Sequence, residues 1–166
     1  MQTQYPDFLP LGEQDWPAVY SMLRQAAAEE RSFTFPTNLE ETAARKLWLL
    51  NPPGITITAF VQGDPAGSAK VGPNQMGPAA HIATASFLVD PRRRGEGVGR
   101  ALALWSIEWA RRQGYAAMQF NAVVETNCVA VALWRSLGFE VVGRIPEAFQ
   151  LPTGERTALL VMHRLL

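Results

Sequence analysis

The sequence predicts an α/β (α+β) fold, in which a mixed sheet carries helices on both faces. Apolar residues recur at helical spacing in some segments and form short strand-like runs in others. Helix-like and strand-like segments alternate only in the second half of the chain. Within residues 89–104, a turn rich in glycine and arginine separates a strand-like run from a helix-like one. These observations favour a sheet with both antiparallel and parallel neighbours.

Length and composition indicate one globular domain, residues 1–166. Hydrophobic residues make up 48% of the chain and charged residues 18%, which is typical of a protein with a packed core. Fifteen Lys and Arg balance fifteen Asp and Glu, so a positive site has to be a local cluster. This balance does not favour a nucleic-acid partner.

Cysteine usage and the terminal segment indicate a cytoplasmic setting. Cys128 is the single cysteine and cannot form an intramolecular disulfide. The N-terminal residues 1–10 lack the basic and then apolar pattern of a signal peptide. No apolar run approaches the roughly 20 residues that cross a bilayer, so we expect no membrane partner.

Two helices are expected first. The first has an apolar stripe, formed by Trp16, Val19, Tyr20, Leu23 and Ala27. The second follows residues 37–41, where Thr37 with Glu40 or Asn38 with Glu41 has the spacing of a capping box. We expect it to stop before Pro52.

A three-strand meander follows the helices. Residues 54–61 and 66–71 read as strands, and the Gly and Pro of residues 62–65 predict a hairpin turn between them. Residues 72–79 read as a loop. Residues 81–90 have the length and bulk of a buried strand that ends at Pro91.

The second half alternates between helix and strand. Residues 97–113 form a helix by their apolar spacing, with cationic residues at the end. Residues 116–123 form a strand, and Asn127 caps a second helix that Gly138 stops. Residues 139–145 and 157–166 complete the chain as strands, whose apolar faces could form a homodimer edge.

The glycine and arginine turn has the character of an anion site. The first turn of a helix carries unpaired N–H groups and a partial positive charge, and glycines let a phosphate approach them. A P-loop is excluded because Gly99 is followed by Arg100 and Ala101, not by Lys and Ser or Thr. The glycine spacing also fits a dinucleotide fingerprint poorly.

The segment Arg94-x-x-Gly97-x-Gly99 resembles the pyrophosphate motif of the GNAT acetyltransferases, which bind acetyl-coenzyme A. A second pattern of that family follows at Asn127, Ala130, Leu133, Gly138 and Phe139. The resemblance covers residues 81–144. It implies a mostly antiparallel central sheet with two splayed parallel strands, and it implies acetyl-CoA as co-substrate without a metal.

The resemblance also assigns roles to residues. Pantetheine would run along the strand before the turn, and backbone amides of the turn would hold the pyrophosphate. Asn127 and Trp134 would face coenzyme A. The implied cofactor residues are Phe87, Leu88, Val89, Arg94, Gly95, Glu96, Gly97, Val98, Gly99, Arg100, Asn127 and Trp134.

The reaction needs an amine, a proton acceptor, an oxyanion donor and a path for thiolate protonation. The backbone N–H near Val89 would serve the oxyanion. Many family members have a tyrosine as general acid where this chain has Trp134, and an indole cannot act as that acid. A coenzyme A thiol with a pKa of about 8.5 can leave as thiolate and take its proton from water.

The sequence leaves the proton acceptor open. Glu125 is the nearest carboxylate to the expected splay, and His81, Glu29, Glu30 and water are alternatives. A solvated residue before a helix is an equally simple role for Glu125, and a satisfied strand-end histidine is the simpler role for His81. Glu29 and Glu30 fall in the first helix–loop region, which the resemblance implies lines the acceptor pocket.

A narrower resemblance concerns the acceptor. Segments 67–74, 81–89, 120–127 and 133–139 are similar to fungal GNAT enzymes that acetylate proline analogues. That similarity implies that Asn121 holds the acceptor's carboxylate, although a neighbouring backbone group is an equally good partner for its amide. Thr84 stands where those enzymes have a second asparagine, so an amino acid or an analogue remains the broader expectation.

The sequence therefore predicts an N-acetyltransferase for a primary or secondary amine of a small molecule. Two other classes stay open: a non-catalytic acyl-CoA-binding module, and a phosphate- or nucleotide-binding domain.

Overall fold

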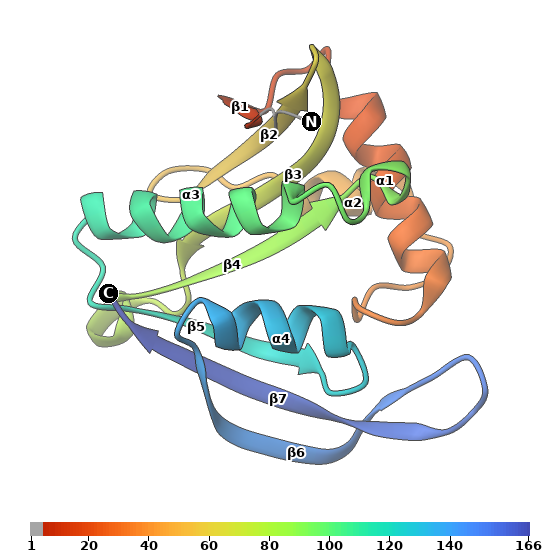
Figure 1. Cartoon of the computed structure of the whole chain (residues 1–166), viewed down its shortest axis with the longest axis vertical. Coiled ribbons are helices and arrows are strands. Elements are labelled where there is room, and N and C mark those ends of the chain that lie inside the picture. The colour runs from red at the N-terminus through yellow and green to blue at the C-terminus, as the bar shows by residue number, and fades with distance from the viewer. Residues whose placement is uncertain (1–4) are drawn as a thin grey trace.

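The computed structural model describes residues 5–166 and contains a seven-stranded sheet (Figure 1). The strand order is β1-β2-β3-β4-β5-β7-β6. The strands are β1 Asp7–Pro10, β2 Ile55–Val61, β3 Asp64–Pro73, β4 Ile82–Val89, β5 Ala117–Val124, β6 Glu140–Gln150 and β7 Arg156–Leu165. Neighbours are antiparallel except for the parallel pair β4–β5. The predicted mixed, mostly antiparallel sheet is confirmed.

Helices cover both faces of the sheet, as expected. They are α1 Trp16–Glu29, α2 Glu41–Trp48, α3 Val98–Arg112 and α4 Cys128–Ser136. One apolar cluster joins α3 and α4 to β4, β5 and β7, and a second joins α3 to β2 and β3. A third cluster contains residues of α1 and α2 together with Leu88 of β4. The sheet therefore has an α3/α4 face and an α1/α2 face.

The parallel strands β4 and β5 separate soon after they meet. They pair only at Ile82 with Ala117 and at Ala83 with Met118. Beyond these pairs the two strands diverge (Figure 1). The expectation that these two strands splay apart is therefore confirmed, and the sheet opens in its middle.

The β2–β3 hairpin also agrees with the sequence. Gln62 and Gly63 both have positive φ values, of 56° and 86°. Two consecutive positive values are typical of the tight turns that match the twist of a hairpin.

Two local expectations are corrected. The sequence pattern does not predict β1, which pairs with β2 at the edge of the sheet. The predicted capping box is also wrong, because α2 starts at Glu41 after an extended Glu40 and has no side-chain cap. Glu41 instead accepts a hydrogen bond from Trp16 Nε1 at 3.0 Å, which ties α2 to α1.

The cytoplasmic setting and the homodimer edge, which the sequence led us to expect, stay predictions. Residues 1–4, part of the segment that lacks a signal-peptide pattern, lie outside the described residues. Within residues 5–166, no helix combines the length and the hydropathy that a membrane span requires.

On β6, Val142 and Ile145 are exposed, which is compatible with the expected homodimer edge without testing it.

Candidate active site

One edge of β4 presents unpaired backbone groups to the opening in the sheet. The N–H of Asp90 donates to Ala66 and the carbonyl of Ile82 accepts from Asn74, so even-numbered residues here face β3. Alternate residues of an antiparallel strand point their backbone groups to opposite sides. Ala85, Phe87 and Val89 therefore direct their N–H groups toward β5, beyond the last β4–β5 pair.

A buried carboxylate shapes the turn that follows β4. Asp90 is 4% exposed and accepts from the Arg92 backbone N–H at 2.9 Å. Arg92 Nη2 also lies 2.7 Å from Asp90 Oδ2. The hydrogen bond from the Arg92 side chain holds the pKa of Asp90 below its ordinary value. The ionised side chain thus fixes the point where the chain leaves the sheet.

The glycines of the turn leave the N-terminus of α3 open. Gly95 and Gly97 have φ values of 85° and 83°, which residues other than glycine rarely adopt. A Cβ atom at either position would meet no atom within 4 Å. Gly97 is the N-cap of α3 and supplies no side-chain hydrogen bond to its first turn. Amides at the start of α3 are therefore available to an anion.

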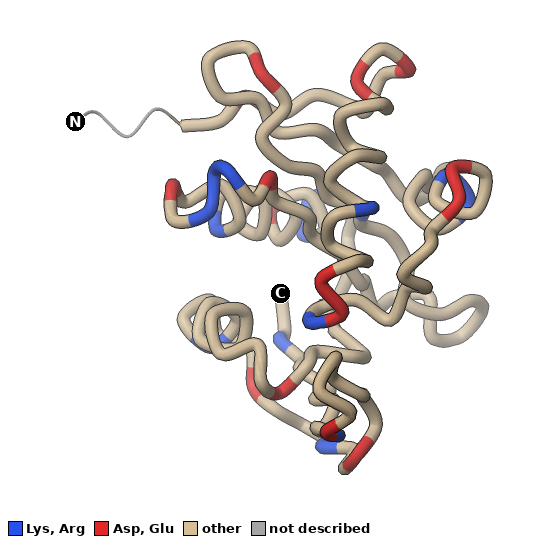
Figure 2. The backbone as a smooth tube through the Cα atoms, turned by 90° about the vertical axis from the view of Figure 1, so that its right-hand side faces the viewer, with Lys and Arg blue, Asp and Glu red and all other residues tan. Residues whose placement is uncertain are grey.

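Figure 2 shows basic and acidic residues close together along the backbone, and each arginine of this turn has a side-chain partner. The pairs are Arg92–Asp90, Arg93–Glu96, Arg94–Glu29 and Arg100–Ser136. Three of these partners are carboxylates, which offset the arginine charge. Arg100 Nη1 instead donates to the Ser136 hydroxyl at 2.9 Å. Of the four, Arg100 therefore keeps most of its positive charge for a ligand at α3.

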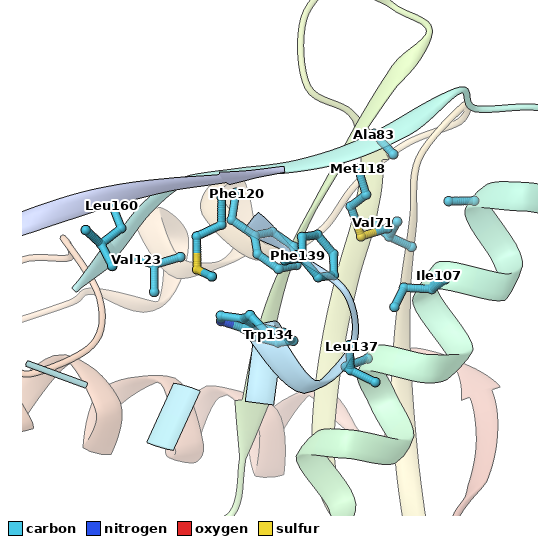
Figure 3. Packing of buried hydrophobic residues seen from close by; sticks show 13 residues of the cluster. Val71, Ala83, Ile107, Met118, Phe120, Val123, Trp134, Leu137, Phe139 and Leu160 are labelled. Atoms are coloured by element: carbon cyan, nitrogen blue, oxygen red, sulfur yellow. The ribbon is translucent and has the colours of Figure 1, made fainter. Parts of the chain in front are cut away.

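An aromatic group bridges the opening on the α3/α4 face. Trp134 of α4 is 8% exposed, and its ring centroid lies 4.9 Å from that of Phe87 and 4.7 Å from that of Phe120. Its indole points toward Phe120 and Phe139 (Figure 3). Asn127 caps α4 as predicted, because its Oδ1 accepts from the Ala130 N–H at 3.2 Å. Trp134 thus links β4 to β5 where their backbones no longer pair.

Asn121 lies in a bulge of β5 on the α1/α2 side. A two-residue alternation along this strand predicts that Val123 lies on the face opposite Phe120. That prediction is wrong, because pairing with β7 shifts between Phe120 and Val123, and Val123 joins Phe120 in the core. Asn121 is exposed, and its Nδ2 donates to Asn74 Oδ1 at 2.6 Å. Its Oδ1 accepts from Gln119 Nε2 at 2.8 Å. Its amide therefore has side-chain partners.

A family model described as the acetyltransferase (GNAT) family matches residues 16–139, which include the turn, the opening and α4. The chain belongs to the acetyltransferase (GNAT) family. The resemblance carried by the glycine and arginine motif is therefore confirmed. So is the expected enzyme class, an acetyltransferase.

Solved structures of acetyltransferases have the same fold. A GCN5-related N-acetyltransferase from Kribbella flavida is 45% identical, with 98% of each chain covered and a TM-score of 0.93. A ribosomal-protein-alanine N-acetyltransferase from Brucella melitensis is 27% identical, with 96% of this chain and 99% of that one covered and a TM-score of 0.86.

Curated relatives match over a shorter region. The N-acetyltransferase aca1 of Schizosaccharomyces pombe is 38% identical over 85 residues, which are 51% of this chain and 41% of the relative. Protein SPT10 of Saccharomyces cerevisiae is 34% identical over 76 residues, which are 46% of this chain and 12% of the relative. The match thus spans less than half the length of either relative.

The candidate proton acceptors of the acetyltransferase occupy different places. Glu125 Oε1 lies 2.6 Å from Arg144 Nε, and that hydrogen bond lowers the pKa of Glu125. His81 Nδ1 lies 3.1 Å from the Pro78 carbonyl oxygen on the exposed surface. Glu29 pairs with Arg94, and Glu30 adopts a left-handed conformation at the end of α1. A carboxylate with a lowered pKa is a weaker base, so the ion pair reduces the suitability of Glu125.

A group of residues, of which the sequence singled out only Thr84, lies on the α1/α2 face. A cavity of about 90 Å³ opens there next to β4. Its lining residues are Leu50, Lys70, Gly72, Pro73, Thr84, Ala85 and Ser86. Besides Thr84, a lysine within the small and apolar residues of β3 was a signal in the sequence that could have indicated it.

A larger cavity, of about 510 Å³, lies between α1 and the turn. Its lining includes Ser21 and Gln25 of α1 and Asp64 at the start of β3, together with Asp90 and Arg93. It borders the turn from the side of α1, whereas the β4 amides and Trp134 face the opening. The opening therefore remains the better candidate for the reaction.

Proposed function

We propose that the protein transfers the acetyl group of acetyl-CoA to a primary or secondary amine of a small molecule, an amino acid or an analogue of one. The observation that carries this proposal is the opening between β4 and β5. It is lined by the N–H groups of Ala85, Phe87 and Val89, and it leads to the uncapped N-terminus of α3. An extended amide-containing chain that ends in a pyrophosphate suits both parts.

Each part of the cofactor has a proposed partner. The amides of residues 95–100, Val98 among them, hold the pyrophosphate, except that of Glu96, whose N–H donates to the Arg93 carbonyl oxygen at 3.3 Å. Arg100 adds positive charge. The pantetheine arm extends along Phe87 and Val89 as an added strand. Leu88 supports this edge from behind, because its side chain is 2% exposed and lies in the cluster with α1 and α2.

The chemistry is a direct attack of a neutral amine on the thioester carbon. The C–N bond forms, a tetrahedral oxyanion develops, and the C–S bond then breaks to release the coenzyme A thiolate. A backbone N–H of β4 near Val89 that the pantetheine arm leaves free stabilises the oxyanion by donating a hydrogen bond. Water accepts the amine proton in place of the ion-paired Glu125, and it also protonates the thiolate, because Trp134 has no acidic group.

The relatives support nitrogen as the atom that is acetylated. The Schizosaccharomyces pombe and Kribbella flavida proteins are both described as N-acetyltransferases. The Brucella melitensis structure is described as acting on a ribosomal-protein alanine. A second candidate acceptor is therefore an N-terminal alanine of a peptide, which also presents a primary amine.

Thiol release from acetyl-CoA tests the proposal. We expect a thiol-reactive dye to record turnover with at least one amine among free amino acids, their decarboxylated amines and peptides that begin with alanine. Coenzyme A should raise the melting temperature, whereas ATP and NAD should not. Stabilisation by coenzyme A without thiol release from any amine would identify a binding module instead.

A further inference from the structure

The cavity of about 90 Å³ on the α1/α2 face has one charged lining residue, Lys70. A single water needs roughly 10–15 Å³ of such volume, so the cavity accommodates a small polar group. Thr84 and Ser86 line it from β4, the strand that borders the opening. The cavity thus approaches the reaction site from the face opposite Trp134.

Strand register places the three polar residues together. Lys70 of β3 pairs with Ser86 of β4, and Gly72 pairs with Thr84. Neighbours across strands have Cβ atoms about 4.5–5.5 Å apart, and alternate residues share a face. Lys70, Thr84 and Ser86 therefore present one ammonium and two hydroxyls to the same side of the sheet.

Buried hydrogen bonds fix the support beneath Lys70. Trp48 is 0% exposed, and its Nε1 donates to Ser68 Oγ at 2.9 Å. Ser68 Oγ in turn donates to the Ile57 carbonyl at 2.7 Å. Lys70 Nζ lies 5.7 Å from the centroid of the Trp48 ring. The ammonium is thus held over a rigid indole at the end of α2.

The ammonium of Lys70 has more N–H donors than hydrogen-bond partners, and it has no carboxylate partner. Its ammonium donates to the carbonyl of Leu47, and an ammonium has three N–H donors. Within residues 5–166, no Asp or Glu forms an ion pair with it. Burial lowers its pKa, which reflects the cost of keeping this cation away from water. An anionic ligand would offset that cost.

We propose that Lys70, with Thr84 and Ser86, binds the carboxylate of an amino-acid acceptor. The inference rests on the proposed function and assigns a subsite to it. The ammonium pairs with the carboxylate, and the hydroxyls on β4 donate to its oxygens. Because the amine of an α-amino acid is one carbon away, a carboxylate held against β4 leaves that amine beside the opening.

The proposal is tested with Lys70→Met, which keeps an unbranched side chain over Trp48 and removes the charge. Lys70→Arg keeps the charge, and Lys46→Met is the matched control, since Lys46 is an exposed lysine of α2. Acceptors are compared in pairs that differ by the carboxylate: alanine with ethylamine, proline with pyrrolidine and phenylalanine with phenethylamine. Melting temperature and the KM for acetyl-CoA are measured for each variant.

We expect Lys70→Met to raise the KM of the amino acids about tenfold to a hundredfold. This is the loss of affinity that usually follows the removal of one hydrogen bond to a charged group. The KM values of the plain amines and of acetyl-CoA should stay within about twofold. Lys70→Arg should retain part of the preference for amino acids over plain amines, and Lys46→Met should have no effect on that preference. Equal losses with both members of a pair would show that Lys70 only supports the end of α2, and would overturn the subsite.

Two further results separate this inference from the proposed function. Turnover of amines by the unchanged protein without preference for the carboxylate would overturn the subsite and leave the acetyltransferase activity intact. Absence of turnover with every amine would count against the proposed function. Calorimetric titration of the same amino acids onto the protein with coenzyme A then reads the subsite directly: binding lost in Lys70→Met supports it, and no binding overturns it.

Discussion

Arg94 Nη2 donates to both carboxylate oxygens of Glu29, at 2.6 and 2.9 Å. The pair joins the end of α1 to the turn proposed to hold pyrophosphate. A bound pyrophosphate and Glu29 would therefore compete for the same guanidinium. Because the two side chains are 57% and 35% exposed, the pair is easily exchanged for a ligand.

The first prediction follows from this competition. Glu29→Gln should tighten acetyl-CoA binding by a few-fold, because the change releases Arg94 for the phosphates, and isothermal titration calorimetry measures it. Arg94→Ala should weaken binding by about 1–3 kcal/mol, the value of one charge-assisted contact. Glu30→Gln, one residue further on, is the control and should leave affinity unchanged. Weaker binding in Glu29→Gln would contradict the competition.

The second prediction concerns the glycine at the start of α3. Gly97→Val should abolish measurable acetyl-CoA binding, because a side chain would fill the space before the amides and strain a φ of 83°. Gly114→Val is a matched control, since Gly114 has a φ of 82° and open surroundings at the other end of α3. Both should lower stability by about 1–2 kcal/mol. If both variants lose affinity equally, the effect is one of folding, not of the site.

The third prediction concerns Trp134. Truncation to alanine should cost about 3–5 kcal/mol of unfolding free energy, because the indole is buried between Phe87 and Phe120. Trp134→Tyr should keep or raise turnover, since a phenol can protonate the thiolate. Trp134→Phe provides the comparison without a hydroxyl. A steep fall in kcat for a well-folded Trp134→Tyr would assign the indole a role that the proposal lacks.

The fourth prediction concerns Asn121. Asn121→Ala should raise the KM of acceptors with a carboxylate severalfold, less than Lys70→Met does, and leave the KM of acetyl-CoA unchanged, because its amide adds a neutral donor beside the carboxylate that Lys70 binds. Asn74→Ala removes the same 2.6 Å hydrogen bond from the other side and is the control for structure. Steady-state kinetics with paired acceptors measures both. Equal effects of the two variants on every acceptor would indicate a purely structural amide pair.

The fifth prediction is a pH profile. Burial lowers the pKa of Lys70, so its positive charge is lost at lower pH than that of an exposed lysine. The kcat/KM for amino acids relative to plain amines should therefore fall as the pH rises through that pKa. The unfolded chain holds this proton to higher pH, so the same titration makes stability rise with pH in that window. In Lys70→Arg, this decrease in relative kcat/KM should disappear. A decrease that persists in that variant would show that another group titrates.

The elements that the sequence predicted well are those with long periodic patterns or strong turn residues. The stripe of α3, the stop at Gly138 and the β2–β3 hairpin all appear where expected. The sequence did not predict β1 because its four residues, the last of which is Pro10, show too little alternation. The capping box failed because Glu41 forms a contact with Trp16, which lies 25 residues away in the chain.

The residues of the site also differ in how well the sequence predicted them. The turn at residues 94–99 carries its motif in consecutive residues, so the sequence indicated it directly. The bulge at Asn121 and Ala122 is invisible to a two-residue period, because it arises from pairing with β7. Lys70 becomes notable only through tertiary contacts with Trp48 and the register with Ser86. No spacing within β3 predicts either.

A sheet that opens in its middle has four edges where an ordinary open sheet has two. Exposed strand edges invite the addition of a strand from another molecule, which leads to aggregation. Here Trp134 spans the two inner edges and obstructs the approach of a second chain from the α3/α4 face. A narrow molecule can still form strand-like hydrogen bonds with Val89 and its neighbours. The opening thus admits a small ligand while it discourages self-association through those inner edges.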